Sequence, residues 1–72
     1  MARRNDKRER LVEAADTLFH QQGVSNTTLA NIATLADVPL GNVYYYFKSK
    51  DSIILAVIER RKKQLSTLFS EW

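Results

Sequence analysis

The sequence predicts an all-α fold: a bundle of three helices followed by the start of a fourth. The chain has 72 residues, which leaves room for one domain. It contains one proline and two glycines, and runs of β-branched residues that alternate with polar ones are missing. A chain this short buries only about 60% of its unfolded surface, so without cysteines helix packing must supply nearly all the stability.

The first helix is expected from about Asp6 to Gln22. Asp6 followed by Glu9 resembles a capping box, and Gly23 suits the left-handed position that ends a helix. The apolar residues that recur on one helical face are Leu11, Ala14, Ala15, Leu18 and Phe19.

The second helix follows a short loop, with Thr27 or Thr28 as its N-terminal cap. An apolar stripe at positions i, i+3, i+4 and i+7 is typical of a helix with one buried face. Here that stripe consists of Leu29, Ile32, Ala33 and Ala36.

Asp37 is placed where the chain must turn, and aspartate tolerates the left-handed conformation better than most residues. Pro39 lacks an amide hydrogen and has a preset φ, so it fits the first turn of a new helix. The third helix is accordingly short, from about Pro39 or Leu40 to Tyr46. Residues 29–47 then form a helix-turn-helix.

The fourth helix is expected to have Ser49 as its cap and Asp51 in its first turn. Its polar middle, Glu59 to Gln64, breaks the apolar stripe, and the basic cluster Arg60 to Lys63 is interpreted as a solvated face. No stop signal precedes the end of the sequence, so we interpret the chain as a piece of something longer. The apolar residues of this helix are Ile54, Val57, Ile58, Leu65, Leu68, Phe69 and Trp72.

The charge balance is mildly basic, with a net charge of +3 and a pI of about 9.5. Such a balance is compatible with a polyanionic partner without proving one. Arg3 and Arg4 allow two interpretations: an arm that reaches a minor groove or a nearby phosphate, or a disordered basic tail. Because no apolar run approaches the roughly 18 residues of a membrane span and no secretory signal is present, we expect a cytoplasmic protein without membrane contact.

The sequence offers no candidate for catalysis or metal binding. His20 has no second histidine with which to build a metal site, and we expect it near a helix end, partly exposed. We find no nucleophile–base set and no glycine-rich loop that would cradle a phosphate. We therefore expect no enzyme, no metal and no cofactor.

The third helix carries three adjacent tyrosines, which sweep roughly 200° around its axis. A two-turn helix cannot bury all of them. Val43 and Phe47, four residues apart, are the expected core pair, with Tyr44 near the boundary. The side chains expected to point largely outward are Asn42, Tyr45 and Tyr46.

Exposed tyrosines beside an asparagine have two interpretations, an ordinary surface or a recognition surface. In the second, Asn42 pairs with adenine in the major groove and tyrosine hydroxyls reach phosphate oxygens. Gly41 would let the helix backbone approach DNA closely. Lys50 opposes the helix dipole, so it is either a solvated lysine or one that meets a phosphate docked at the helix start.

Four segments together resemble the TetR family of bacterial transcriptional repressors: 27–33, 36–38, 41–47 and 49–51. The resemblance extends from about Arg8 to about Ile58. It implies a homeodomain-like bundle in residues 1–50 that binds DNA through its helix-turn-helix. Residues 51–72 would be the fourth helix, a linker to a ligand-binding and dimerisation domain outside this chain.

The resemblance also implies roles for individual residues. Thr28 would open the second helix and touch phosphate, Tyr44 and Lys50 would touch phosphate, and Tyr45 would touch a base edge or phosphate. Val43 and Phe47 would be core. The complete set of expected DNA-binding residues is Thr28, Pro39, Leu40, Gly41, Asn42, Tyr44, Tyr45, Tyr46 and Lys50.

Three positions depart from the family pattern. Asp37 stands where glycine is frequent, Pro39-Leu40 replaces a frequent Ser-Lys pair, and Ala30 stands where many members have arginine. This version should therefore depend less on charge at the recognition helix. Leu40 either meets a thymine methyl group or joins the core, since it shares helical spacing with Val43.

The expected function is therefore that of a sequence-specific DNA-binding domain, reading the major groove with its third helix. By resemblance, the intact protein would be a ligand-responsive repressor that binds a pseudo-palindromic operator as a homodimer and responds to a small-molecule effector. The alternative is a helical protein-interaction module that uses the tyrosine-rich face. A membrane-surface segment is a further rival, supported only by the basic end of the fourth helix.

Overall fold

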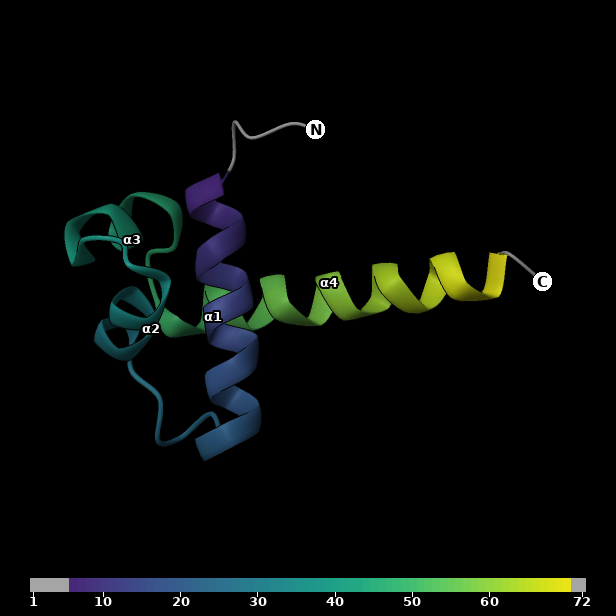
Figure 1. Ribbon diagram of the computed structural model, residues 1–72, viewed down its shortest axis with the longest axis horizontal. Helices are drawn as coiled ribbons and strands as arrows, with labels where there is room; N and C mark the ends of the chain where they lie inside the picture. The colour runs from purple at the N-terminus through teal and green to yellow at the C-terminus, as the bar shows by residue number, and fades with distance from the viewer. Residues whose placement is uncertain (1–5, 71–72) are drawn as a thin grey trace.

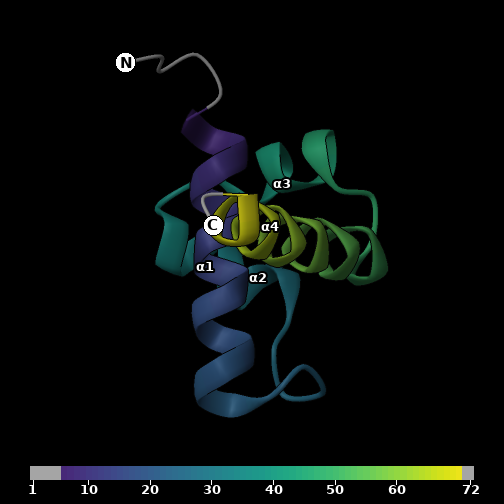
Figure 2. The ribbon, with the colours of Figure 1, turned by 90° about the vertical axis from the view of Figure 1, so that its right-hand side faces the viewer.

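Four helices build the described part of the chain, which in this computed structural model is residues 6–70, with side chains from residue 7 to residue 63. They are α1 (Asp6–Gln22), α2 (Leu29–Ala36), α3 (Leu40–Tyr46) and α4 (Lys50–Ser70). Figure 1 shows α2 and α3 on one side of α1, while α4 runs across α1 and projects beyond it. Figure 2 looks along α4 and shows α1 crossing it. The expectations for Arg3, Arg4 and the side chains beyond residue 63 lie outside the described residues.

Helix α1 has the predicted bounds. Gly23 adopts a φ of 89°, and its N–H donates to the carbonyl oxygen of Phe19 at 3.0 Å. Glycine has no Cβ, so it takes this left-handed conformation at no steric cost and ends the helix. His20 lies in the last turn and is exposed. The fully or nearly buried residues of α1 are Leu11, Val12, Ala14 and Ala15.

Helix α2 is capped by Thr28, which settles the choice between the two threonines. The Thr28 hydroxyl accepts from the N–H of Asn31 at 3.0 Å, and the Asn31 side chain accepts from the N–H of Thr28 at 3.1 Å. This reciprocal pair is a capping box, which satisfies two backbone donors at the helix start. The predicted stripe is confirmed for three positions: Ile32, Ala33 and Ala36 are buried, and Leu29 packs against the core at its edge.

The turn between α2 and α3 has the predicted conformation. Asp37 has a φ of 61°, and the N–H of Val38 donates to the carbonyl oxygen of Ala33 at 3.0 Å. Pro39, with a φ of −60°, is the residue before α3, so its missing N–H falls where a helix has no acceptor to offer. Residues 29–47 are therefore a helix-turn-helix, as predicted.

One core joins α1, α2, the turn, α3 and α4. Helix α4 contributes Ile53 and Val57, both buried, so its first two turns belong to the same packing unit as residues before 50. A division of the chain at residue 50 therefore cuts through this core. The predicted stripe on α4 is confirmed for Val57 and wrong for two other positions: Ile54 is only half-buried, and Ile58 is 48% exposed. Ile53, four residues before Val57, takes the place of Ile54 on the buried face.

The start of α4 follows Ser49 directly. The hydroxyl of Ser52 accepts from the N–H of Ser49 at 3.3 Å and donates to the carbonyl oxygen of Ser49 at 2.8 Å. The Ser52 side chain, in the first turn of the helix, therefore closes back onto the backbone of Ser49. The predicted capping bond from the Ser49 side chain is not among the hydrogen bonds of the described residues.

The middle of α4 is tied to α1 by ion pairs. Arg60 contacts Asp16 at 3.3 Å and Glu13 at 3.4 Å, and Arg61 contacts Asp16 at 2.6 Å. The interpretation of this stretch as a solvated face holds for Arg61, which is exposed although it is paired, while Arg60 is partly buried. Because α4 crosses α1, the two side chains meet carboxylates on the polar side of α1. Over residues 6–70, no helix is long and apolar enough to cross a membrane.

Candidate nucleic-acid interface

Helix α3 is anchored from within and exposed on its other side. Val43 is completely buried and Phe47 is 3% exposed, which confirms the predicted core pair. Tyr45 is 76% exposed and Tyr44 is also exposed. The two anchors therefore fix the helix while the face around Tyr45 stays open to a partner.

Tyr46 differs from the expectation of an outward side chain. It is half-buried and packs against the core, and its ring lies edge-on to that of Tyr45 with the centroids 5.1 Å apart. The physical reason is helical spacing, because Tyr46 follows Val43 by three residues and so shares its face. Tyr44, expected at the boundary, is the more exposed of the two. Asn42, also expected to point largely outward, is half-buried.

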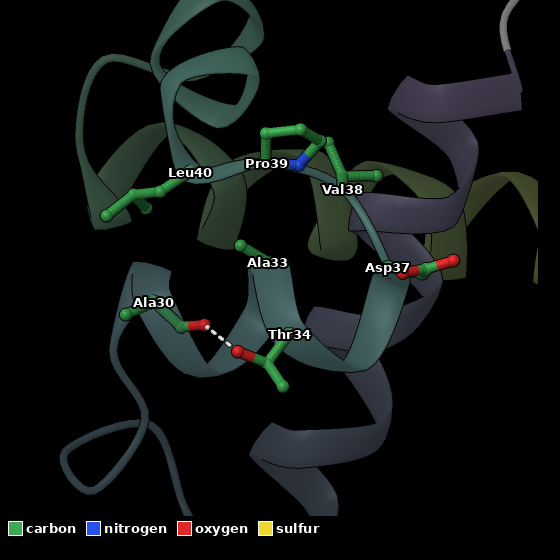
Figure 3. Close-up of a pocket in the computed structure, with 7 residues that line it drawn as sticks. All are labelled: Ala30, Ala33, Thr34, Asp37, Val38, Pro39 and Leu40. Atoms are coloured by element: carbon green, nitrogen blue, oxygen red, sulfur yellow. Dashed lines mark hydrogen bonds between the residues drawn. The ribbon is translucent and has the colours of Figure 1, made fainter.

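Leu40 lies outside the core cluster and is 40% exposed. It lines an open groove of about 450 Å³ between α2 and the start of α3. Figure 3 shows Leu40 at the start of α3 above Ala30 of α2, with the groove between them, and the Thr34 hydroxyl turned back toward the carbonyl oxygen of Ala30. The groove residues are Ala30, Ala33, Thr34, Asp37, Val38, Pro39 and Leu40. Of the two interpretations of Leu40, the structure excludes the core position.

Gly41 is exposed in the first turn of α3, and a Cβ built on it would meet no atom within 4 Å. Packing within the bundle therefore does not require glycine at this position. The backbone there is open to close approach from outside.

Lys50 has partners that the sequence did not predict. Its ammonium donates to the carbonyl oxygens of Val24 at 2.8 Å and Thr27 at 2.9 Å, both in the loop before α2. The lysine is half-buried, and Thr28, directly after the loop, is exposed. We expected the Lys50 ammonium to point toward a phosphate. In the structure, two of its three N–H groups donate hydrogen bonds to the protein backbone.

Two arginines of α1 hold the helix-turn-helix in place, and sequence reasoning missed both. Arg10 donates to the carbonyl oxygens of Ala36 at 2.8 Å and Asp37 at 3.2 Å. The guanidinium of Arg8 lies 5.2 Å from the centroid of the Phe47 ring, a cation–π arrangement. Their partners lie at least 26 positions away in sequence, so no local pattern pointed to them.

The structure thus groups the expected site residues in two places. Pro39, Leu40, Gly41, Tyr44 and Tyr45 are all exposed on the turn and α3. The start of α2 and the start of α4 meet through the Lys50 side chain. In the described part of the chain, no cluster of three or more histidine, cysteine or acidic side chains is arranged to hold a metal ion.

Comparison with known proteins decides the family. The model of the bacterial regulatory proteins of the tetR family matches residues 11–57. The chain belongs to the tetR family. The match covers α2, α3, the buried part of α1 and the first two turns of α4. This tetR-family chain is a helix-turn-helix DNA-binding domain of a transcriptional regulator.

Individual relatives agree with this assignment. The chain is 36% identical over 69 residues to an uncharacterized HTH-type transcriptional regulator in the dhlA 5' region of Xanthobacter autotrophicus, covering 96% of this chain and 34% of that protein. It is 39% identical over 54 residues to the HTH-type transcriptional regulator TtgR of Pseudomonas putida, covering 75% and 26%. It is 36% identical over 56 residues to the HTH-type transcriptional repressor NemR of Escherichia coli, covering 78% and 28%. The chain thus spans about a quarter to a third of these relatives.

The departures from the tetR-family pattern noted in the sequence gather at one place. Ala30, Asp37, Pro39 and Leu40 all line the groove between α2 and α3. Three of them, Ala30, Pro39 and Leu40, therefore place apolar side chains where the family pattern would place arginine and a Ser-Lys pair.

Proposed function

We propose that this chain binds duplex DNA with α3 in the major groove and the start of α2 on the sugar–phosphate backbone. One observation carries the proposal: Val43 and Phe47 anchor α3 in the core while Tyr44 and Tyr45 stay exposed. A short helix held in this way presents a rigid surface, and rigidity lowers the entropic cost of binding.

In this proposal, uncharged side chains contact the edges of the bases. Asn42 pairs with the edge of an adenine through two hydrogen bonds, which is the favoured contact of asparagine in the major groove. Leu40, exposed at the groove, contacts a thymine methyl group. Pro39 and Gly41 line the same surface and let the backbone approach the bases.

Phosphate contacts set the orientation of the domain. The hydroxyls of Tyr44 and Tyr45 reach backbone oxygens, or for Tyr45 a base edge. Thr28 meets a phosphate at the start of α2, where free N–H groups and the helix dipole favour an anion. Tyr46 supports Tyr45 through its ring contact rather than facing DNA itself.

For the whole protein we propose a repressor. The relatives are about three to four times longer than the matched segment, and a second domain following α4 would bind a small-molecule effector and form a homodimer. Two DNA-binding heads then meet half-sites of a pseudo-palindromic operator, one or more helical turns of roughly 34 Å apart. Such a regulator acts in the cytoplasm, and its function involves no chemical step.

Selection of bound duplexes from random DNA tests the proposal. The bound pool should yield one preferred sequence, and Asn42→Ala should relax the preference at a single adenine position. Gln21→Ala, at an exposed position on α1, is the matched control and should leave the preference unchanged. A pool without any preferred sequence, or an unchanged preference with Asn42→Ala, would contradict the proposal. Capture of a protein partner with salt-independent affinity would instead favour the protein-interaction alternative.

A further inference from the structure

Lys50 holds one particular peptide group, the one between Thr27 and Thr28. Its ammonium donates to the carbonyl oxygen of Thr27 at 2.9 Å. The N–H of the same planar peptide belongs to Thr28 and donates to the Asn31 side chain at 3.1 Å. The peptide is therefore held on its oxygen by α4 and on its nitrogen by α2.

The rest of the loop is already fixed to the end of α1. The Thr27 hydroxyl, which is completely buried, donates to the carbonyl oxygen of Gly23 at 2.8 Å. Gln22 and Asn26 exchange hydrogen bonds of 3.0 and 2.9 Å between side chain and backbone. With these contacts in place, the Lys50 hydrogen bonds link the loop to α4. The link therefore joins the first residue of α4 to two carbonyl oxygens of the loop, those of Val24 and Thr27.

From this geometry we infer that Lys50 is a positioning residue for DNA binding and acts through Thr28. By orienting the Thr27–Thr28 peptide, the ammonium sets the direction of the first turn of α2 and of the Thr28 hydroxyl. The inference rests on the proposed function, in which Thr28 meets a phosphate. It assigns Lys50 a different task from a direct phosphate contact.

The link has a mechanical consequence. Helix α4 carries Lys50 in its first turn and Ile53, completely buried, in its second. A rotation of α4 about Ile53 would move the ammonium away from the Thr27 carbonyl oxygen. The start of α2 then loses a restraint, so a displacement of α4 reaches the phosphate-contacting end of α2 through one side chain.

The test compares Lys50→Met with Lys48→Met in the 72-residue chain. Methionine keeps the unbranched apolar stem of the side chain and removes its charge and donors. Lys48 is exposed and has no hydrogen bond to any of the described residues, so its variant controls for the loss of one positive charge. Amide hydrogen exchange of Thr28 is measured in the free protein, and affinity for a selected duplex is measured over a series of salt concentrations. Circular dichroism checks that each variant is folded.

We expect Lys50→Met to accelerate exchange of the Thr28 amide about tenfold and Lys48→Met to leave it unchanged. We expect Lys50→Met to weaken DNA binding by about three- to tenfold while the dependence of log K on log salt keeps its slope. A lost phosphate contact would reduce that slope by about 0.9. A reduced slope would overturn the inference, because Lys50 would then contact DNA directly.

A double-mutant comparison asks whether the effect passes through Thr28. Thr28→Gly removes the hydroxyl while glycine is still tolerated at a helix N-cap. In this background Lys50→Met should add little further loss of affinity, whereas a residue that acts only on stability would add its full effect. An additive loss would overturn the inference, as would unchanged affinity despite faster exchange.

A second variant and the unaltered chain serve as further controls. Lys50→Gln retains an N–H donor on a neutral side chain about as long as methionine and should give intermediate exchange and affinity. It replaces Lys50→Met if that variant does not fold. Failure of the unaltered chain to bind any duplex would refute the proposed function itself. That result is distinct from a chain that binds DNA but is indifferent to position 50.

Discussion

Arg10 in α1 donates a hydrogen bond of 2.8 Å to the carbonyl oxygen of Ala36, the last residue of α2. The same nitrogen contacts the carbonyl oxygen of Asp37 at 3.2 Å. The last carbonyls of a helix have no partner within it, so a cation from another helix satisfies them and complements the negative end of the dipole. A side chain of α1 thus holds the end of α2 and the first residue of the turn.

Arg10→Met should lower the free energy of unfolding by about 1.5–3 kcal/mol, the usual contribution of hydrogen bonds from a charged donor. Urea denaturation followed by circular dichroism measures the change. Lys7→Met, at an exposed position one turn earlier, should change it by less than about 0.5 kcal/mol. Equal effects of the two variants would show that the contact at Ala36 does not contribute.

Asp37 occupies a left-handed conformation, with a φ of 61°. Asp37→Gly should raise the free energy of unfolding by about 0.5–1 kcal/mol, because glycine adopts this conformation without strain. Asp37→Ala should lower it, since alanine has neither the freedom of glycine nor the local hydrogen bonding of aspartate. The two melting temperatures, measured side by side, should therefore move in opposite directions. A shift of both in the same direction would be inconsistent with backbone strain as the cause.

The pairs between Asp16 and both Arg60 and Arg61 should stabilise the crossing of α1 and α4. Asp16→Asn should lower the free energy of unfolding by about 1 kcal/mol at low salt, and the difference should shrink in 1 M NaCl because salt screens such pairs. Glu13→Gln, which removes one longer contact to Arg60, should have a smaller effect. Denaturation at two salt concentrations checks both, and a difference that does not depend on salt would contradict the ion-pair explanation.

Adjacent tyrosines on α3 should respond differently to truncation. Tyr45→Ala, at the 76% exposed position, should change stability by less than about 0.5 kcal/mol while weakening DNA binding. Tyr46→Ala removes a ring packed against the core and should cost about 2 kcal/mol. Thermal melting and duplex binding of the two variants separate the roles. The opposite order of stabilities would show that the assignment of the two rings is reversed.

Local rules predicted most of the fold. The bounds of α1, the left-handed Gly23 and Asp37, and the cap at the start of α2 each depend on residues within a few positions of one another. Capping, turn and helix-period chemistry act over such short distances, so a single sequence expresses them directly.

What the sequence could not predict depends on how the helices cross. Lys50 finds carbonyl oxygens 23 and 26 positions earlier, and Arg61 finds a carboxylate 45 positions earlier. Each of these cations looked like a solvated or phosphate-facing residue when only its own helix was considered. Tyr46 is more buried than Tyr44, and Ile53 is more buried than Ile54, in both cases the reverse of the prediction. The exact rotation of a short or interrupted helix is set by packing rather than by its own pattern.

At Gly41, the stability of the domain and its binding to DNA favour different residues, because a Cβ there would meet no other part of the bundle. An alanine there would favour the helical state of α3, because it has less conformational freedom to lose, and its methyl group would touch nothing in the bundle. A duplex pressed against α3 would have to accommodate that methyl group. A stabler domain and a closer approach to the bases therefore demand different residues at the same site.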